Sequence, residues 1–143
     1  MRPVHKLIIH CSSTPEGHDV TIDDIRAWHT APTQRGGNGW RDIGYHYVVH
    51  LDGSVHRGRL ESTTGAHCAG HNHDSIGICY VGGLADDGFT PKDTRTPAQR
   101  EAMKKLVAEL LGRYPGAAVL GHNDLNPRKA CPCFRVECLL SGH

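Results

Sequence analysis

Three side chains that can bind a metal ion stand where the chain is expected to reach the edge of a sheet. His10 ends the apolar run KLIIH, His122 ends the run AVLGH, and Cys131 lies in the loop that follows His122. Two imidazole nitrogens and a thiolate suit zinc, and three protein ligands leave a fourth position for water. A water molecule on such an ion ionises near neutral pH and becomes a nucleophile.

These residues meet only if the two apolar runs form neighbouring strands. In open α/β sheets, binding sites form at the ends of such strands, and the loop after His122 would then bring Cys131 back. The alternative is that His10 and His122 are ordinary strand-end histidines and that Cys131 is a buried thiol.

The composition is typical of one soluble globular domain. At 143 residues the chain is long enough for a hydrophobic core, and we expect a single domain over residues 1–143. The net charge is +1 with neutral histidines, and no run of one charge sign occurs, so we expect neither nucleic acid nor an acidic membrane as a partner. No apolar stretch approaches the ~20 residues that a membrane-spanning helix needs.

The first apolar run, in MRPVHKLIIHCSS, is too short for the apolar region of a signal peptide. We therefore expect synthesis in a cytoplasm, where the six cysteines are free thiols or metal ligands. A disulfide among them stays open if the protein reaches an oxidising periplasm. Cys11, Cys79 and Cys138 lie in or beside apolar segments and are expected to be buried.

Apolar runs predict strands over residues 6–12, 75–83 and 117–122. Residues 44–59 contain alternating side chains followed by Asp52-Gly53, which predicts a hairpin.

Two segments carry the signals of a helix start. Thr21 and Thr96 are N-caps, and Asp24 and Gln99, three positions later, complete capping boxes. The helices are expected over residues 21–30, with apolar positions Ile22, Ile25 and Trp28, and over 96–116, with apolar positions Met103, Leu106, Val107, Leu110 and Leu111. Strands and helices that mix along one chain predict an α/β fold with a central sheet flanked by helices.

Six ordered motifs resemble those of a known enzyme family. The motifs are IIHCSST, IRAWH, GWRDIGYHYVVHLDGSVHRGR, HNHDSIGICYVGG, FTPKDTRTPAQ and GHNDLNPRKACPCF, and the resemblance that they carry spans roughly residues 4 to 140. Together they resemble the zinc-dependent N-acetylmuramoyl-L-alanine amidases of the phage-lysozyme, or endolysin, type, which are related to peptidoglycan recognition proteins. The resemblance implies a single domain with a central mixed sheet, a Zn²⁺ cofactor and bacterial peptidoglycan as the partner. It also implies hydrolysis of the amide that joins N-acetylmuramic acid to L-alanine of the stem peptide.

The resemblance implies that His10, His122 and Cys131 bind the metal. By position, Tyr45 in GYH matches the family's active-site tyrosine, and Lys129, two places before Cys131, matches its active-site lysine. In these roles Lys129 would stabilise an oxyanion as a second positive charge, and Tyr45 would orient the attacking water.

Two departures from the family pattern leave alternatives open. Residues 123–130 separate His122 from Cys131, one residue more than is usual in the family, and this places Arg128 beside Lys129. Either cation could therefore face the site. Cys133 could also compete for the metal, although the KACP register favours Cys131 as the ligand.

Other histidines have weaker claims to function. The segment AHCAGHNHD could form a second metal site, but loop histidines are usually solvated, and we expect a substrate contact from His67 instead. Trp40, on a Gly-rich loop, is either a second substrate contact or part of a wall, and His29 is expected to pack in the core. Exposed positions are expected for His5, His18, His46, His50 and His56.

Three functions remain in competition. The first is a phage or prophage endolysin, a monomer that waits in the host cytoplasm and acts on peptidoglycan after release. The second is a cytosolic amidase that recycles soluble muropeptides. The third is a non-catalytic recognition module, and because such relatives usually lack the ligand cysteine, the presence of Cys131 weighs against it.

Overall fold

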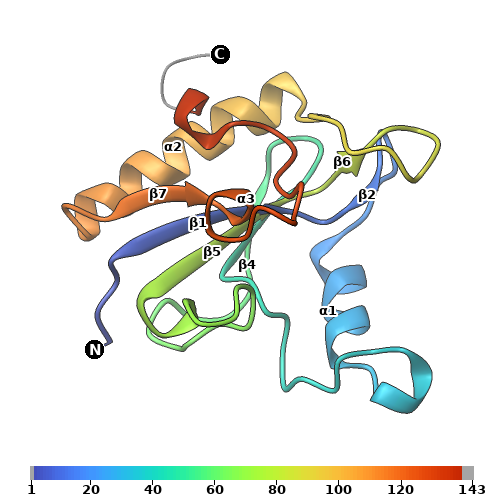
Figure 1. Cartoon of the computed structure of the whole chain (residues 1–143), viewed down its shortest axis with the longest axis horizontal. Coiled ribbons are helices and arrows are strands. Elements are labelled where there is room, and N and C mark those ends of the chain that lie inside the picture. The colour runs from blue at the N-terminus through green and yellow to red at the C-terminus, as the bar shows by residue number, and fades with distance from the viewer. Residues whose placement is uncertain (1, 140–143) are drawn as a thin grey trace.

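A five-stranded mixed sheet forms the centre of the molecule (Figure 1). The computed structural model describes residues 2–139, apart from the side chain of Cys138, so the burial predicted for that cysteine lies outside the described residues. The strand order is β4 (Val55–Arg57), β3 (Tyr47–Val49), β5 (Ser75–Tyr80), β1 (Lys6–Cys11) and β7 (Ala118–Gly121). Strands β3, β5, β1 and β7 are parallel, and β4 pairs antiparallel with β3. The predicted α/β fold with a central mixed sheet is confirmed.

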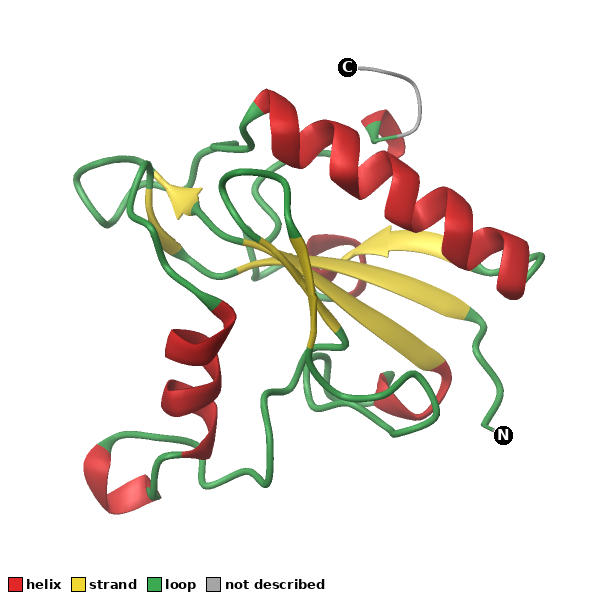
Figure 2. Ribbon diagram, turned by 180° about the vertical axis from the view of Figure 1, so that it is seen from behind, coloured by secondary structure: helices red, strands yellow, loops and turns green. Residues whose placement is uncertain are grey.

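Helices cover both faces of the sheet (Figure 2). Successive residues of a strand point to opposite faces. Ile78 packs in the core beneath α2 (Pro97–Arg113), whereas its neighbour Cys79 packs in the core beside α1 (Ile22–Thr30). The two helices therefore lie on opposite sides, as expected from the sequence.

Both predicted capping boxes are present. The Thr96 hydroxyl accepts from the Gln99 backbone N–H at 3.0 Å, and the Gln99 side chain accepts from the Thr96 N–H at 2.9 Å. Thr21 and Asp24 make the same pair of bonds at the start of α1. Each box satisfies backbone donors that the helix itself leaves unpaired, and this fixes the helix starts.

Trp28 does not belong to the buried stripe of α1, because its side chain is 49% exposed. The inward position is taken by His29, which follows Ile22 by seven residues and so returns to the same helix face. The predicted packing of His29 inside the fold is therefore correct in direction, although its ring is only partly buried.

The predicted hairpin is confirmed, with Gly53 in the turn at φ +85°. The exposure predicted for His46 is wrong, since this side chain is fully buried. Its Nδ1 accepts from the Gly77 backbone N–H at 3.0 Å, and its Nε2–H donates to the Thr63 carbonyl at 2.8 Å. With both ring nitrogens bonded, a neutral imidazole can be buried without an unpaired polar atom.

The other four histidines that were expected to be exposed divide into two pairs. His5 and His18 are exposed as predicted. His50 and His56 are partly buried instead, and their rings stack with centroids 3.8 Å apart.

The third predicted strand ends one residue earlier than expected. β7 stops at Gly121, and His122 opens a short helix, α3 (His122–Leu125). The Asp124 carboxylate accepts the Gly121 backbone N–H at 2.8 Å, which turns the chain out of the sheet at this point. The sequence also failed to predict a small parallel pair of strands, β2 (Thr14–Pro15) and β6 (Gly83–Leu84).

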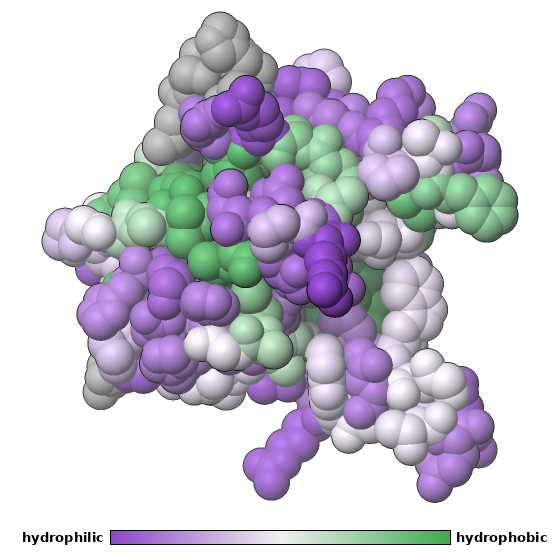
Figure 3. Space-filling view, viewed as in Figure 1, coloured by the Kyte–Doolittle hydropathy of each residue, from purple (hydrophilic) through white to green (hydrophobic). Residues whose placement is uncertain are grey.

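In the space-filling view, apolar side chains gather over β7, and polar side chains cover the loop that follows it (Figure 3). None of the helices in the described part of the chain has the length and apolar character needed to cross a membrane.

Candidate active site

The strand register brings His10 and His122 together. β1 and β7 pair in parallel as far as Ile9 and Gly121, and the two histidines are the next residues along each chain segment. Their ring centroids lie 4.8 Å apart at an interplanar angle of 67°. The condition that the two strands lie side by side is met, and both imidazoles lie at one edge of the sheet.

The loop after α3 returns Cys131 to the same edge. The Asn123 backbone N–H donates to the Cys131 carbonyl at 2.9 Å, which closes the loop. The Cys131 Sγ lies 3.8 Å from His10 Nδ1 and accepts a hydrogen bond from the Cys11 backbone N–H at 3.1 Å. A backbone donor to sulfur favours its thiolate form.

The three donors have the spacing of ligands to one ion. One donor atom each from His10, His122 and Cys131 lies within 4.8 Å of the others. Bonds of about 2.0 Å to nitrogen and 2.3 Å to sulfur place two nitrogen ligands and one sulfur ligand of a tetrahedral ion roughly 3.3–3.5 Å apart, so a small inward shift suffices. Contact with the Cys11 thiol and burial raise the pKa of the Cys131 thiol. A cation bound between the three donors would lower this pKa again, because it stabilises the thiolate. The donor set therefore fits a zinc-like ion with an open position.

Burial lowers the pKa of His10 well below its ordinary value, and the charges of His67 and His122 add to this effect. A neutral imidazole is the form that binds a metal. His10 is 1% exposed, so its ring is held in place by its surroundings.

His67 lies behind His10 and bonds to the ring nitrogen that faces away from Cys131. His10 Nε2 and His67 Nδ1 are 2.8 Å apart, and the two rings meet edge to face. On its far side, His67 Nε2 lies 3.2 Å from the Ser75 hydroxyl. If His10 donates from Nε2, its Nδ1 is left unprotonated on the side of Cys131, where a metal ligand is needed.

The backbone around His67 is shaped to hold this ring. The Asn72 side-chain oxygen accepts from the backbone N–H groups of His67 and Cys68 at 3.0 and 2.9 Å. Gly77, on β5, supplies the space, since a Cβ there would lie 2.6 Å from the His67 ring. Asn72, Ser75 and Gly77 are not predicted as site residues from the sequence, where their only signal is their place in the motif HNHDSIG.

Tyr45 also packs near His10, with ring centroids 5.2 Å apart. It lines a hollow together with His67 and Trp40. Burial raises the pKa of Tyr45 well above its ordinary value, so the phenol keeps its proton at neutral pH. The structure thus brings the predicted tyrosine to the predicted metal ligands.

Trp40 forms part of the wall of this hollow. Its ring packs edge to face on His29 at a centroid distance of 5.0 Å. His29 Nδ1 in turn accepts the Gly44 backbone N–H at 3.0 Å, which fixes the segment that carries Tyr45. His29 therefore supports the site rather than only filling the core.

Lys129 lines a second hollow, beside His122, and this hollow shares His67 with the first. The charge of Lys129 contributes, after burial, to a lowered pKa of His122. Both cations are exposed, but Arg128 lines neither hollow. Of the two neighbouring cations, Lys129 is the one that stands at the site.

No second metal site forms in the described part of the chain. The trio of His10, His122 and Cys131 is the only group of three or more such donors there. The histidine-rich loop splits, because His67 turns towards His10 while His73 remains exposed. Cys133 is not part of the trio either, and its Sγ lies 3.9 Å from Cys11 Sγ.

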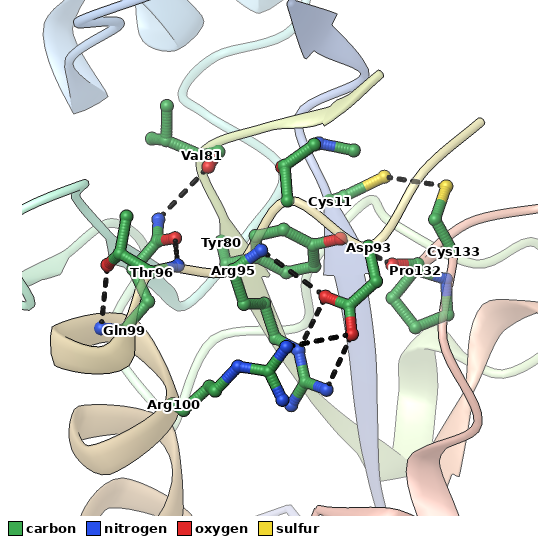
Figure 4. A network of polar contacts seen from close by, with 12 residues as sticks. Cys11, Tyr80, Val81, Asp93, Arg95, Thr96, Gln99, Arg100, Pro132 and Cys133 are labelled. Atoms are coloured by element: carbon green, nitrogen blue, oxygen red, sulfur yellow. Dashed lines mark hydrogen bonds and ion pairs between the residues drawn. The ribbon is translucent and has the colours of Figure 1, made fainter. Parts of the chain in front are cut away.

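Several contacts hold the loop that carries Cys131 (Figure 4). The Tyr80 hydroxyl donates to the Pro132 carbonyl at 2.6 Å. The Arg95 guanidinium lies 3.5 Å from the centroid of the Phe134 ring and bonds to Asp93 at 2.9 Å. These anchors fix the position of the sulfur relative to the strand ends.

The sequence matches a known family over most of its length. The family described as N-acetylmuramoyl-L-alanine amidase (Amidase_2) matches residues 1–134. The chain is 41% identical to an endolysin of Escherichia phage T7 over 131 residues, which cover 92% of the chain and 82% of that endolysin. It is 40% identical to an endolysin of Klebsiella phage KP32 over 132 residues, with the same coverage of both chains.

Solved structures share the fold. Drosophila PGRP-LB superposes with a TM-score of 0.74 at 28% identity and covers 92% of this chain and 76% of its own. The Ph2119 endolysin from a Thermus scotoductus bacteriophage superposes with a TM-score of 0.77 at 24% identity, covering 99% and 85%. From these matches and the site geometry, the chain belongs to the N-acetylmuramoyl-L-alanine amidase family.

Proposed function

We propose that a zinc ion held by His10, His122 and Cys131 serves the amidase reaction of this chain. The observation that carries the proposal is the convergence of these three donors beside two hollows. When bound, zinc supplies Lewis acidity and makes water a better nucleophile at neutral pH.

The reaction is hydrolysis of the amide between N-acetylmuramic acid and L-alanine in bacterial peptidoglycan. The family match and the phage relatives place the chain among the endolysins. The two hollows share the wall formed by His67, Cys68 and Ala69, and a strand of peptidoglycan is proposed to lie across them.

Lys129 is proposed to stabilise the oxyanion. Attack on an amide carbonyl places negative charge on the carbonyl oxygen, and a positive charge already in position lowers the energy of that state. Lys129 lines the hollow on the His122 side and so stands at the edge of the metal site.

Tyr45 is proposed to orient the attacking water and to help its proton reach the leaving amine. The phenol lies against the His10 ring and keeps its proton, because burial raises its pKa. Its hydroxyl can therefore both donate and accept a hydrogen bond during attack. Trp40 is proposed to contact the substrate from the wall of the same hollow.

The test is cleavage of purified sacculi, followed by chemical labelling of newly exposed amino groups on L-alanine. We expect labelling that stops when a chelator removes the metal and returns when zinc is added. Cleavage of soluble muropeptides alone would support the recycling amidase instead. Binding to sacculi without new amino groups would support a recognition module.

We further propose that the enzyme acts as a monomer and meets its substrate after release from the host cytoplasm. The likeness to phage endolysins supports this route. Sedimentation of the zinc-loaded enzyme at micromolar concentration tests the oligomeric state, and a dimer would contradict the proposal.

A further inference from the structure

Two thiols outside the metal trio face each other. Cys11 Sγ and Cys133 Sγ are 3.9 Å apart, and both labelled side chains point into the same gap (Figure 4). A disulfide joins sulfurs at about 2.05 Å, so the pair is within a side-chain rotation of bonding distance. The two residues are far apart in the sequence, and only the fold brings them together.

The pair lies next to the metal site without being part of it. Cys11 directly follows His10 on β1, and successive strand residues point to opposite faces. Cys11 accordingly packs in the core beneath α2, and Cys133 packs against the same core. Cys131 is held by the Cys11 backbone N–H at 3.1 Å, so a bond between the side chains of Cys11 and Cys133 leaves the metal-facing sulfur free.

The surroundings keep the two sulfurs close. Gly83 leaves room for them, since a Cβ at this position would lie 2.4 Å from Cys11 Sγ and 3.7 Å from Cys133 Sγ. Cys133 adopts a left-handed conformation, with φ +69°, that residues with a side chain rarely take. The Tyr80 hydroxyl holds the preceding residue, Pro132, through its carbonyl.

We propose that Cys11 and Cys133 are a disulfide-forming pair that closes when the enzyme reaches an oxidising compartment. One cysteine thiolate attacks the disulfide of an oxidant, which releases one oxidant thiolate and leaves a mixed disulfide. The second cysteine thiolate then attacks the protein sulfur of that mixed disulfide and displaces the other oxidant thiolate. The two cysteines lose two protons and two electrons in total, and the oxidant is reduced to two thiols. The product ties the end of β1 to the loop that carries Cys131.

The bond acts as a staple between the two segments that carry His10 and Cys131. The effect of the disulfide on the metal site rests on the proposed function, whereas the formation of the disulfide does not. A cross-link between distant residues restricts the unfolded chain most strongly, so the oxidised enzyme is more stable than the reduced one. The staple would protect the enzyme after it has left the reducing cytoplasm.

The test oxidises the zinc-loaded enzyme with glutathione disulfide. We expect a mass loss of about 2 Da, the mass of the two hydrogens removed in forming one disulfide. Peptide mapping should join the peptides that contain Cys11 and Cys133, and the midpoint of thermal unfolding should rise by roughly 5–10 °C. Cys133→Ser should abolish the mass loss and the rise, and Cys68→Ser should still form the bond.

Two outcomes overturn the proposal: an unchanged mass, or a bond from Cys11 to Cys131 accompanied by release of zinc. Zinc content and cleavage of sacculi are measured on the same samples. An enzyme that forms the Cys11–Cys133 bond but holds no zinc would contradict the proposed function and leave the staple standing.

Discussion

The imidazoles of His10 and His122 lie one register step beyond Ile9 and Gly121, the last paired residues of β1 and β7. Parallel strands end at the same edge of a sheet, so the backbone ladder itself sets the distance between the two rings. Two of the three proposed ligands are therefore placed by the most regular part of the fold. Only Cys131 depends on a loop.

The identity of the sulfur ligand gives the first prediction. Cys131→Ser should lose most of its zinc to a competing chelator and lose hydrolysis of sacculi, because it removes one of three donors. Cys133→Ser should keep both, since its sulfur faces Cys11. Metal analysis of the two purified variants beside the wild type decides the matter, and zinc loss in Cys133→Ser alone would reverse the assignment.

His67 should act through His10. His67→Ala removes the acceptor 2.8 Å from His10 Nε2 and should weaken zinc binding roughly 10–100-fold. His67→Asn keeps an acceptor near the position of Nδ1 and should recover much of the affinity. Chelator competition measures the affinity, and kcat and KM are measured at saturating zinc. Normal zinc affinity with a raised KM in His67→Ala would instead establish the substrate contact that the sequence predicted.

Substitutions of the neighbouring cations Lys129 and Arg128 should affect kcat differently. Lys129→Ala should lower kcat about 10²–10³-fold, the effect of removing one oxyanion-stabilising group. Arg128→Ala should leave kcat close to the wild-type value, because Arg128 lines neither hollow. Zinc content should be unchanged in both variants. A larger fall in kcat in Arg128→Ala than in Lys129→Ala would mean that Arg128, and not Lys129, stabilises the oxyanion.

Tyr45→Phe removes one hydroxyl and keeps the ring against His10. We expect kcat to fall about 10²–10⁴-fold, the range for loss of a group that assists proton transfer, with zinc still bound. Turnover of sacculi and metal content are measured on one preparation. Nearly normal turnover would remove Tyr45 from the mechanism.

Stability should decline in acid partly through His46. Burial lowers the pKa of His46 to about 4, against about 6.5 in an unfolded chain. As the pH falls, the unfolded state therefore binds the proton first. The free energy of unfolding is unaffected by His46 above about pH 6.5 and decreases as the pH falls from 6.5 to about 4. The loss amounts to about 3 kcal/mol at most.

The matched variant is His46→Asn, which keeps an acceptor for the Gly77 N–H but cannot titrate in this range. Urea unfolding of the metal-free proteins at pH 7.5 and 4.5 should show a smaller pH effect in the variant. If the free energy of unfolding fell by the same amount between pH 7.5 and pH 4.5 in both proteins, the assignment to His46 would be contradicted.

Local signals explain what the sequence predicted correctly. The capping pair of Thr96 and Gln99 acts within one helical turn, and short apolar runs predict β1 and β7 to within one residue of their ends. Such signals depend on interactions within a few residues, so the tertiary structure does not override them. They located His10 and His122 at the ends of apolar runs, but the pairing of the two strands and the return of Cys131 depend on contacts between distant segments.

The sequence could not reveal contacts between distant segments. His46 and His67 have no local pattern that distinguishes a buried imidazole from a solvated one. Their partners are the Gly77 N–H for His46 and the His10 ring for His67, both on other segments of the chain. The failure to foresee β2 and β6 has a different cause, because strands of two residues have no periodicity to detect.

The packing of His67 constrains Gly77, a residue in the middle of β5. No left-handed backbone requires glycine at this position; the His67 ring occupies the space that a methyl group would need. An alanine there would displace that ring and, with it, the support of His10. A residue with no chemistry of its own is thus constrained by the metal site, and one added carbon atom in the middle of a strand should weaken zinc binding much as the loss of His67 does.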